Sequence, residues 1–180
     1  MKLSVSNAFI VISTIFTIFS FQNPELINMF GMSHLFLSQG DYVKLLIQFC
    51  LYSFLHGVFF HLLFNSLFLY FFGNQLEYLI GKTWYIVFFI FTTLFNGIAL
   101  LLLTQEGTIT FGISGFALAI ISFYTLLLYD VKNPEYKGGI TALVINILVG
   151  FSPQVSFVGH LFGAISGGIF YGLYKFLGKK

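Results

Sequence analysis

Charged side chains are scarce in this chain, and their scarcity constrains the fold more than any other feature. The 180 residues include eight lysines, six acidic residues and no arginine, so that 8% are charged, and the mean hydropathy is +0.94. A soluble domain carries about 25% charged residues because its surface faces water. Most of this surface must therefore face lipid, and we expect an all-α integral membrane protein.

Six apolar runs are candidates for transmembrane helices, for which about 20 mostly apolar residues are needed. The fifth run is short, so it must thin the bilayer locally or be sheltered by its neighbours. The expected fold is a single membrane domain over residues 1–180, a bundle of six transmembrane helices. The predicted spans are residues 3–21, 45–72, 83–103, 112–129, 138–151 and 155–177.

The lysines test this count independently, because basic residues concentrate on the cytoplasmic side of a membrane. With six spans both termini share one side, and the other side holds only Lys44. We therefore expect a multi-pass protein with cytoplasmic N- and C-termini. No targeting extension is recognised, and the apolar N-terminal run lacks a clear cleavage site for a signal peptide, which favours a prokaryotic cell membrane. The lysines on the shared side are Lys2, Lys82, Lys132, Lys137, Lys175, Lys179 and Lys180.

Polar residues at membrane depth are costly, which makes them candidates for function. The second run contains His56, His61 and Asn65. His61 and Asn65 are four residues apart and share a helix face. On a continuous helix His56 would lie about 140° away from His61, so it need not share that face. Hydrogen bonding between helices is the alternative role for such residues.

A second polar site opens the fourth run, where Gly112-Ile113-Ser114-Gly115 precedes an apolar stretch. Free N–H groups at a helix N-terminus favour negative charge, as a serine nucleophile requires for the oxyanion of its tetrahedral intermediate. An ordinary serine N-cap is the alternative.

The sixth run carries a third site, His160, at the head of a ridge of small residues. Gly159, Gly163 and Gly167 repeat every four residues, a pattern that lets another helix approach closely. With the N-terminus inside, the second, fourth and sixth spans all begin on the outer side. His61, Ser114 and His160 then lie at similar depth, which incidental polar residues would not be expected to do.

Together these residues resemble the rhomboid family of intramembrane serine proteases over residues 45–177. The order, the spacing and the placement on alternate spans all agree with that family. The matching patterns are His-x4-His-x3-Asn at His56, His61 and Asn65; Gly-x3-Glu-x3-Gly at Gly73, Glu77 and Gly81; Gly-x-Ser-Gly at Gly112, Ser114 and Gly115; and His-x2-Gly-x3-Gly at His160, Gly163 and Gly167. One departure is that many rhomboids carry a Trp-Arg pair after the first span, whereas this chain has no arginine and its only tryptophan is Trp84.

The resemblance implies an endopeptidase in which Ser114 is the nucleophile and His160 its base. His61, Asn65 and the Ser114 N–H would stabilise the oxyanion. Gly112, Gly115, Gly163 and Gly167 would provide close helix packing. No acidic residue is well placed to orient His160, so we expect a Ser–His dyad. The implied partners are single-span membrane proteins in the bilayer, admitted beside the short fifth span, and no metal or cofactor is expected.

Other functions are compatible with parts of this pattern. A rhomboid-like pseudoprotease would bind or sort membrane proteins, but both Ser114 and His160 are present. A polytopic transporter usually needs an acid or a lysine in mid-span, and none is evident. Zinc could bind His56, His61 and His160 only if they converge. Nothing near Cys50 would lower its pKa for a nucleophilic role. The net charge of +2 is too small and scattered for nucleic-acid binding. The oligomeric state is not readable.

Overall fold

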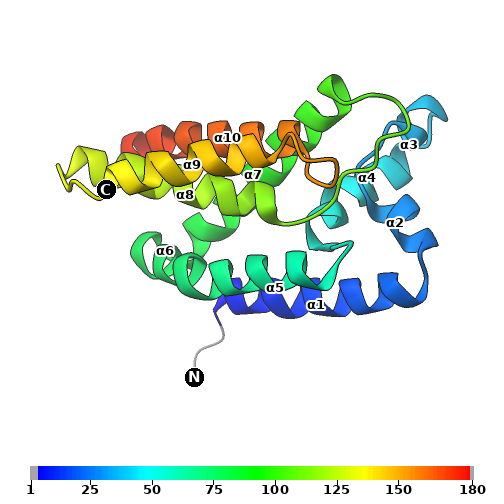
Figure 1. The fold of residues 1–180 in the computed structure, drawn as a ribbon, viewed down its shortest axis with the longest axis horizontal. Helices are drawn as coiled ribbons and strands as arrows, with labels where there is room; N and C mark the ends of the chain where they lie inside the picture. The colour runs from blue at the N-terminus through cyan, green and yellow to red at the C-terminus, as the bar shows by residue number, and fades with distance from the viewer. Residues whose placement is uncertain (1–3, 179–180) are drawn as a thin grey trace.

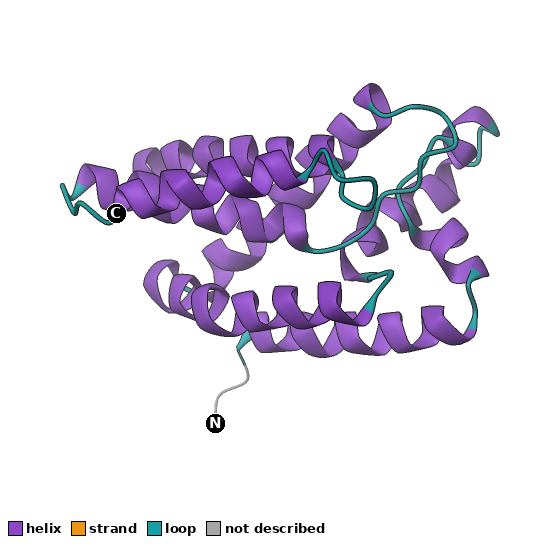
Figure 2. Ribbon diagram, viewed as in Figure 1, coloured by secondary structure: helices purple, strands orange, loops and turns teal. Residues whose placement is uncertain are grey.

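The computed structural model of the chain describes residues 4–178, and this part is built from helices joined by short loops (Figure 2). No strand occurs among these residues; the only extended pairing there is an isolated bridge between Met32 and Thr110. The elements are α1 (Val5–Gln22), α2 (Glu25–Phe30), α3 (Leu35–Ser38), α4 (Tyr42–Leu51), the 3₁₀-helix η1 (Tyr52–Phe54), α5 (Phe59–Phe68), the π-helix η2 (Leu69–Gly73), α6 (Asn74–Ile80), α7 (Lys82–Leu103), α8 (Ser114–Asp130), α9 (Tyr136–Val149) and α10 (Phe157–Leu177).

The lengths and composition of these helices confirm the all-α membrane class. Within residues 4–178, α1, α7 and α10 are each long and apolar enough to cross a membrane. A fourth candidate is the pair 42–54 and 59–80, and the apolar helices α8 and α9 are shorter. These elements are compatible with six spans, which remains a prediction. Lys2, Lys179 and Lys180, used in the orientation argument, lie outside the described residues.

The second predicted span, residues 45–72, is wrong as one continuous helix. The chain breaks at residues 55–58, and the helices on either side are bent by 76°. Leu55 and Val58 take extended backbone conformations, with ψ near 150°, and Gly57 between them has low helix propensity. An apolar run reports length but not continuity. The helical stretch that fits this span therefore runs over residues 59–80, and α4 precedes it.

The arrangement places three short helices, α2, α3 and α4, at one end of the molecule (Figure 1). α8 packs against α9, and α10 packs against both α7 and α8. α1 and α5 lie together along another side. The short helices α2, α3 and α4 lie at the right of Figure 1, at the same end as the beginnings of α5 and α10. With the N-terminus inside, this would be the outer end of the bundle.

Aromatic side chains fill the centre of the bundle. Phe88 of α7 stacks on Phe170 of α10, with ring centroids 4.4 Å apart, and Phe116 of α8 meets Phe88 edge-on at 5.2 Å. Phe9 brings α1 into the same cluster through Phe89, 4.2 Å away. Such contacts are worth about 0.5–1.5 kcal/mol per pair beyond the area they bury. They hold α1, α7, α8 and α10 as one packed unit.

The beginning of α1 is tied to the end of α6 by a buried carboxylate. Glu77 accepts hydrogen bonds from the backbone N–H groups of Val5 and Ser6, each 2.9 Å long. These are N–H groups that a helix N-terminus leaves unpaired. After Gly81, whose φ of 82° suits glycine, α7 begins at once. The Gly73, Glu77 and Gly81 pattern of the sequence thus lies where α1, α6 and α7 meet.

Candidate active site

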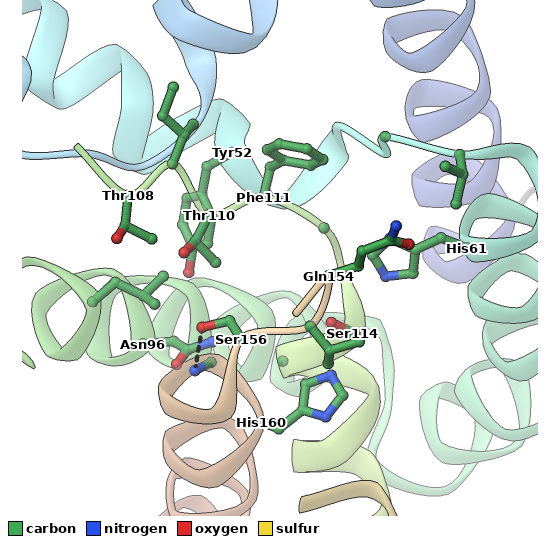
Figure 3. A pocket seen from close by; sticks show the side chains of 18 of the residues that line it. Tyr52, His61, Asn96, Thr108, Thr110, Phe111, Ser114, Gln154, Ser156 and His160 are labelled. Atoms are coloured by element: carbon green, nitrogen blue, oxygen red, sulfur yellow. Dashed lines mark hydrogen bonds between the residues drawn. The ribbon is translucent and has the colours of Figure 1, made fainter. Parts of the chain in front are cut away.

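A cavity of about 530 Å³ opens between α5, α8 and α10. It is lined from widely separated parts of the chain, with His61 from α5, Ser114 from α8 and His160 from α10. The segments 108–112 and 153–156 form parts of its wall. Figure 3 shows the side chains of Ser114 and His160 next to one another at this cavity. Three of the polar residues singled out from the sequence therefore line one cavity.

Ser114 is the first residue of α8, where the helix leaves backbone N–H groups without helical partners. The first N–H bonded to the preceding turn is that of Ala117, which donates to the Ile113 carbonyl. The N–H of Ser114 itself is therefore available at the cavity. The positive end of the α8 dipole adds to its preference for negative charge.

Gly112 brings α5 against the beginning of α8. Its φ of 120° is a conformation that side-chain-bearing residues rarely adopt, and a Cβ there would lie 2.8 Å from the His61 ring. The N–H of Gly112 donates to the Tyr52 carbonyl at 2.9 Å, which anchors the segment just before Ser114. A glycine is needed at this position for both conformational and steric reasons.

His160 lies in the first turn of α10, and its environment fixes the ring. The Ser156 hydroxyl caps the helix by accepting from the Gly159 N–H at 3.0 Å. The imidazole Nδ1 lies 2.8 Å from the backbone carbonyl of Asn146. Because a carbonyl can only accept, Nδ1 must carry the proton in this contact. The other nitrogen, Nε2, is then the one left to act as a base.

The glycine ridge of α10 explains how Ser114 and His160 come together. A Cβ on Gly163 would lie 2.4 Å from the Gly115 carbonyl oxygen, and a Cβ on Gly167 would lie 2.2 Å from that of Ala119. Both distances are too short for any side chain. The backbones of α8 and α10 therefore touch along this seam, which starts beside Ser114 and His160.

The remaining polar residues predicted from the sequence lie at the edge of this site. Asn65 is buried on α5, one turn beyond His61, and is not part of the cavity wall. His56 is fully buried, and its ring centroid is 4.9 Å from that of His61. The estimate of 140° assumed one continuous helix; His56 instead precedes α5, so the break brings the two rings together. No group of three potential metal-binding side chains occurs within residues 4–178.

Several polar residues of the cavity wall were not singled out from the sequence, and two of them, Tyr52 and Asn96, are buried. Tyr52 is buried and donates its hydroxyl to the Thr93 carbonyl at 2.8 Å. Asn96, on α7, is 4% exposed, and its amide lies against the backbone of Gly115. A mid-helix asparagine in an apolar run is the signal that could have identified Asn96. No pattern in the sequence indicated that Tyr52 would line the cavity.

Comparison with known proteins adds one finding. A family model described as the Rhomboid domain matches residues 44–177, most of the chain and all of the cavity wall. No curated protein matches the chain.

Proposed function

Since the chain belongs to the rhomboid family, we propose that it is an intramembrane serine endopeptidase that uses Ser114 and His160. Members of that family act on membrane proteins in a bilayer, mostly as serine proteases, although some are inactive. One observation carries the proposal. Ser114 and His160 line the same cavity, and the contact of Nδ1 with the Asn146 carbonyl leaves Nε2 as the ring nitrogen that can take a proton.

The proposed reaction begins with a proton transfer. His160 Nε2 takes the hydroxyl proton of Ser114 as Oγ attacks the scissile carbonyl carbon. The tetrahedral intermediate then collapses, the C–N bond breaks, and the imidazolium returns its proton to the leaving amine. Water, deprotonated by the same nitrogen, hydrolyses the acyl-enzyme and frees Ser114. No carboxylate takes part, so the Asn146 carbonyl occupies the place that an aspartate fills in a triad.

Donors for the oxyanion lie around the nucleophile. The Ser114 N–H at the start of α8 is one, and the His61 ring, packed against Gly112, is the second. Asn65 is buried one turn beyond His61 and outside the cavity wall, so its proposed role requires its amide to reach the intermediate. Removing one oxyanion donor typically costs about 10²–10³-fold in kcat, and we expect this range for His61→Ala.

The proposed substrates are single-span membrane proteins whose helix can unwind near its outer end. A helix hides its carbonyls in hydrogen bonds, so the scissile segment must become extended to reach Ser114. α9 is the proposed lateral gate, because none of its 14 residues is buried. The orientation proposed from the lysines, with both termini in the cytoplasm, puts the cavity on the outer side.

Purified protein in liposomes with a model single-span substrate tests the proposal. Ser114→Ala and His160→Ala should each lower kcat by at least about 10³-fold. Thermal unfolding should show that both variants are folded like the parent. Labelling of the parent by a fluorophosphonate probe at Ser114 is the companion measurement. Undiminished cleavage by Ser114→Ala would refute the assigned nucleophile. A folded parent that neither cleaves nor labels would instead indicate a pseudoprotease.

The gate is tested separately by cross-linking the outer halves of α5 and α9 through introduced cysteines, in a Cys50→Ser background because Cys50 is exposed. Cleavage of membrane substrates should stop, while labelling by the small probe should continue. Normal cleavage after complete cross-linking would exclude access between these two helices.

A further inference from the structure

A contact between Asn146 and His160 connects α9, which has no buried residue, to the proposed catalytic base. The carbonyl of Asn146 lies 2.8 Å from Nδ1 of His160 and comes from the last turn of α9. The Asn146 side chain is engaged elsewhere, since its amide donates to the Ala142 carbonyl at 2.8 Å. The group that meets the imidazole is thus part of the backbone.

This carbonyl is available because α9 tightens at its end. In a regular α-helix it would accept the N–H four residues later, that of Gly150. Gly150 instead donates to Ile147 at 3.0 Å, and the next two N–H groups also bond three residues back, to Leu148 and Val149. The carbonyls of residues 147–149 are therefore satisfied within the turn. The Asn146 carbonyl is left over and points to His160.

Gly150 sets how closely this turn approaches α10. A Cβ built on Gly150 would lie 2.7 Å from the Cα of Phe157, the first residue of α10. The φ of Gly150 is −58°, so an alanine would suffer no backbone strain there. The Cβ would instead meet backbone on two sides, the Cα of Phe157 in α10 and, at 2.8 Å, the carbonyl oxygen of Ile147 in its own turn. Absence of a side chain at Gly150 therefore holds the end of α9 within hydrogen-bond reach of His160.

We propose that the Asn146 carbonyl is a positioning group that sets the tautomer and direction of His160, so that catalysis requires the end of α9 to be seated against α10. The inference rests on the proposed protease function. Which imidazole nitrogen is protonated depends on the hydrogen bond that the other makes. When the end of α9 moves away, Nδ1 loses its hydrogen-bond acceptor, and the imidazole ring is no longer held in one orientation. While α9 is displaced to admit a substrate, it cannot hold His160 as an active base. α9 must therefore return before Ser114 can react.

The tautomer is measured directly by ¹⁵N NMR of histidine-labelled protein in bilayers, with the His160 signals identified by their loss in His160→Ala. At a pH where the ring is neutral, the proton should reside on Nδ1. A proton found mainly on Nε2 would overturn the proposal. This measurement needs no substrate, so its result does not depend on whether the chain is a protease.

The kinetic test pairs two glycines of α9. Gly150→Ala should push the turn from α10, shift the His160 proton away from Nδ1 and lower kcat by about 10²-fold, the usual cost of a 1 Å misplacement, with KM little changed. Gly138→Ala is the matched control, because nothing lies within 4 Å of its Cβ position. Unchanged kcat in Gly150→Ala, or a loss of kcat with the Nδ1 proton retained, would refute the positioning role.

A backbone variant covers the case in which Gly150→Ala fails to fold. Replacing Ile147 by its α-hydroxy acid turns the amide that follows Asn146 into an ester, whose carbonyl is a weaker acceptor. The same exchange at Ile145 removes one helix N–H as well but leaves the Asn146 carbonyl an amide. Only the exchange at position 147 should lower kcat and alter the His160 tautomer. Equal effects of both exchanges would contradict the proposal.

Discussion

α9 and α10 both pack against α8, yet they do so in opposite ways. α10 buries eight residues and brings its backbone against that of α8 at Gly163 and Gly167. α9 buries none of its residues, and its Gly139 lies against the side chain of Thr125. Interiors packed this closely resist deformation, whereas elements with few buried contacts open at lower free energy.

The contrast indicates a division of labour within one bundle. Ser114 and His160 stand at the head of the rigid seam, so their separation is set by two backbones in contact. The direction of the imidazole, however, is set by a carbonyl from the loosely held helix. The contact between α8 and α10 fixes the positions of Ser114 and His160, and the position of α9 determines when the two can react.

The strongest way to break the comparison is to add a methyl group to the seam. Gly163→Ala and Gly167→Ala should each lower the free energy of unfolding by about 3 kcal/mol, the upper part of the range for overpacking, because the obstacle is backbone. Cleavage should be largely lost as α8 and α10 separate. Gly172→Ala, on the same helix with nothing within 4 Å, is the control and should be neutral or slightly stabilising. Equal stability of all three variants in thermal unfolding would mean that α8 and α10 can move apart at little cost in free energy.

A smaller effect is expected from the same exchange on the α9 side. The Cβ of Gly139→Ala would meet the Thr125 hydroxyl, which belongs to a side chain that can rotate at the loss of its 2.8 Å bond to the Ile121 carbonyl. We expect a destabilisation of about 1 kcal/mol, the usual net value of a hydrogen bond. Thermal unfolding of Gly139→Ala beside Thr125→Val would test this reading. A loss as large as that of Gly163→Ala would remove the distinction between the two interfaces.

The smallest effect is predicted at the other end of the seam. Lys175 and Tyr171 of α10 both donate to Asp130 at the end of α8. Lys175 and Asp130 are partly exposed, and such pairs contribute at most about 1 kcal/mol. Lys175→Ala should therefore change the free energy of unfolding by less than this value and leave kcat unaltered. A marked fall in kcat would show that this end of the seam is coupled to the site.

The sequence predicted those parts of the molecule that depend on composition and periodicity. The expected span 83–103 agrees with α7, Lys82–Leu103, because a long apolar run between a glycine and polar loop residues has few alternatives. Ser114, His160 and His61 were singled out as candidate site residues because polar side chains are rare at membrane depth. The family model agrees with the resemblance on which their roles rest.

What the sequence could not predict depends on backbone geometry. The break at residues 55–58 lies inside an apolar run, and only the fold reveals that His56 folds back onto His61. The Asn146 carbonyl carries no residue-type signal, since every residue has one. Its availability follows from three hydrogen bonds at the end of α9 that join residues three apart instead of four. Tyr52 likewise reaches the cavity because η1 turns it inward.

The cavity wall contains no lysine, aspartate or glutamate among the residues that the structure describes. A wall without fixed charge exerts no long-range attraction that dissolved ions could screen. Encounter between this protein and a membrane-bound partner would then be governed by diffusion in the plane of the bilayer. Turnover should follow the number of substrate molecules per lipid, not their concentration per volume of solution, and should be nearly indifferent to ionic strength.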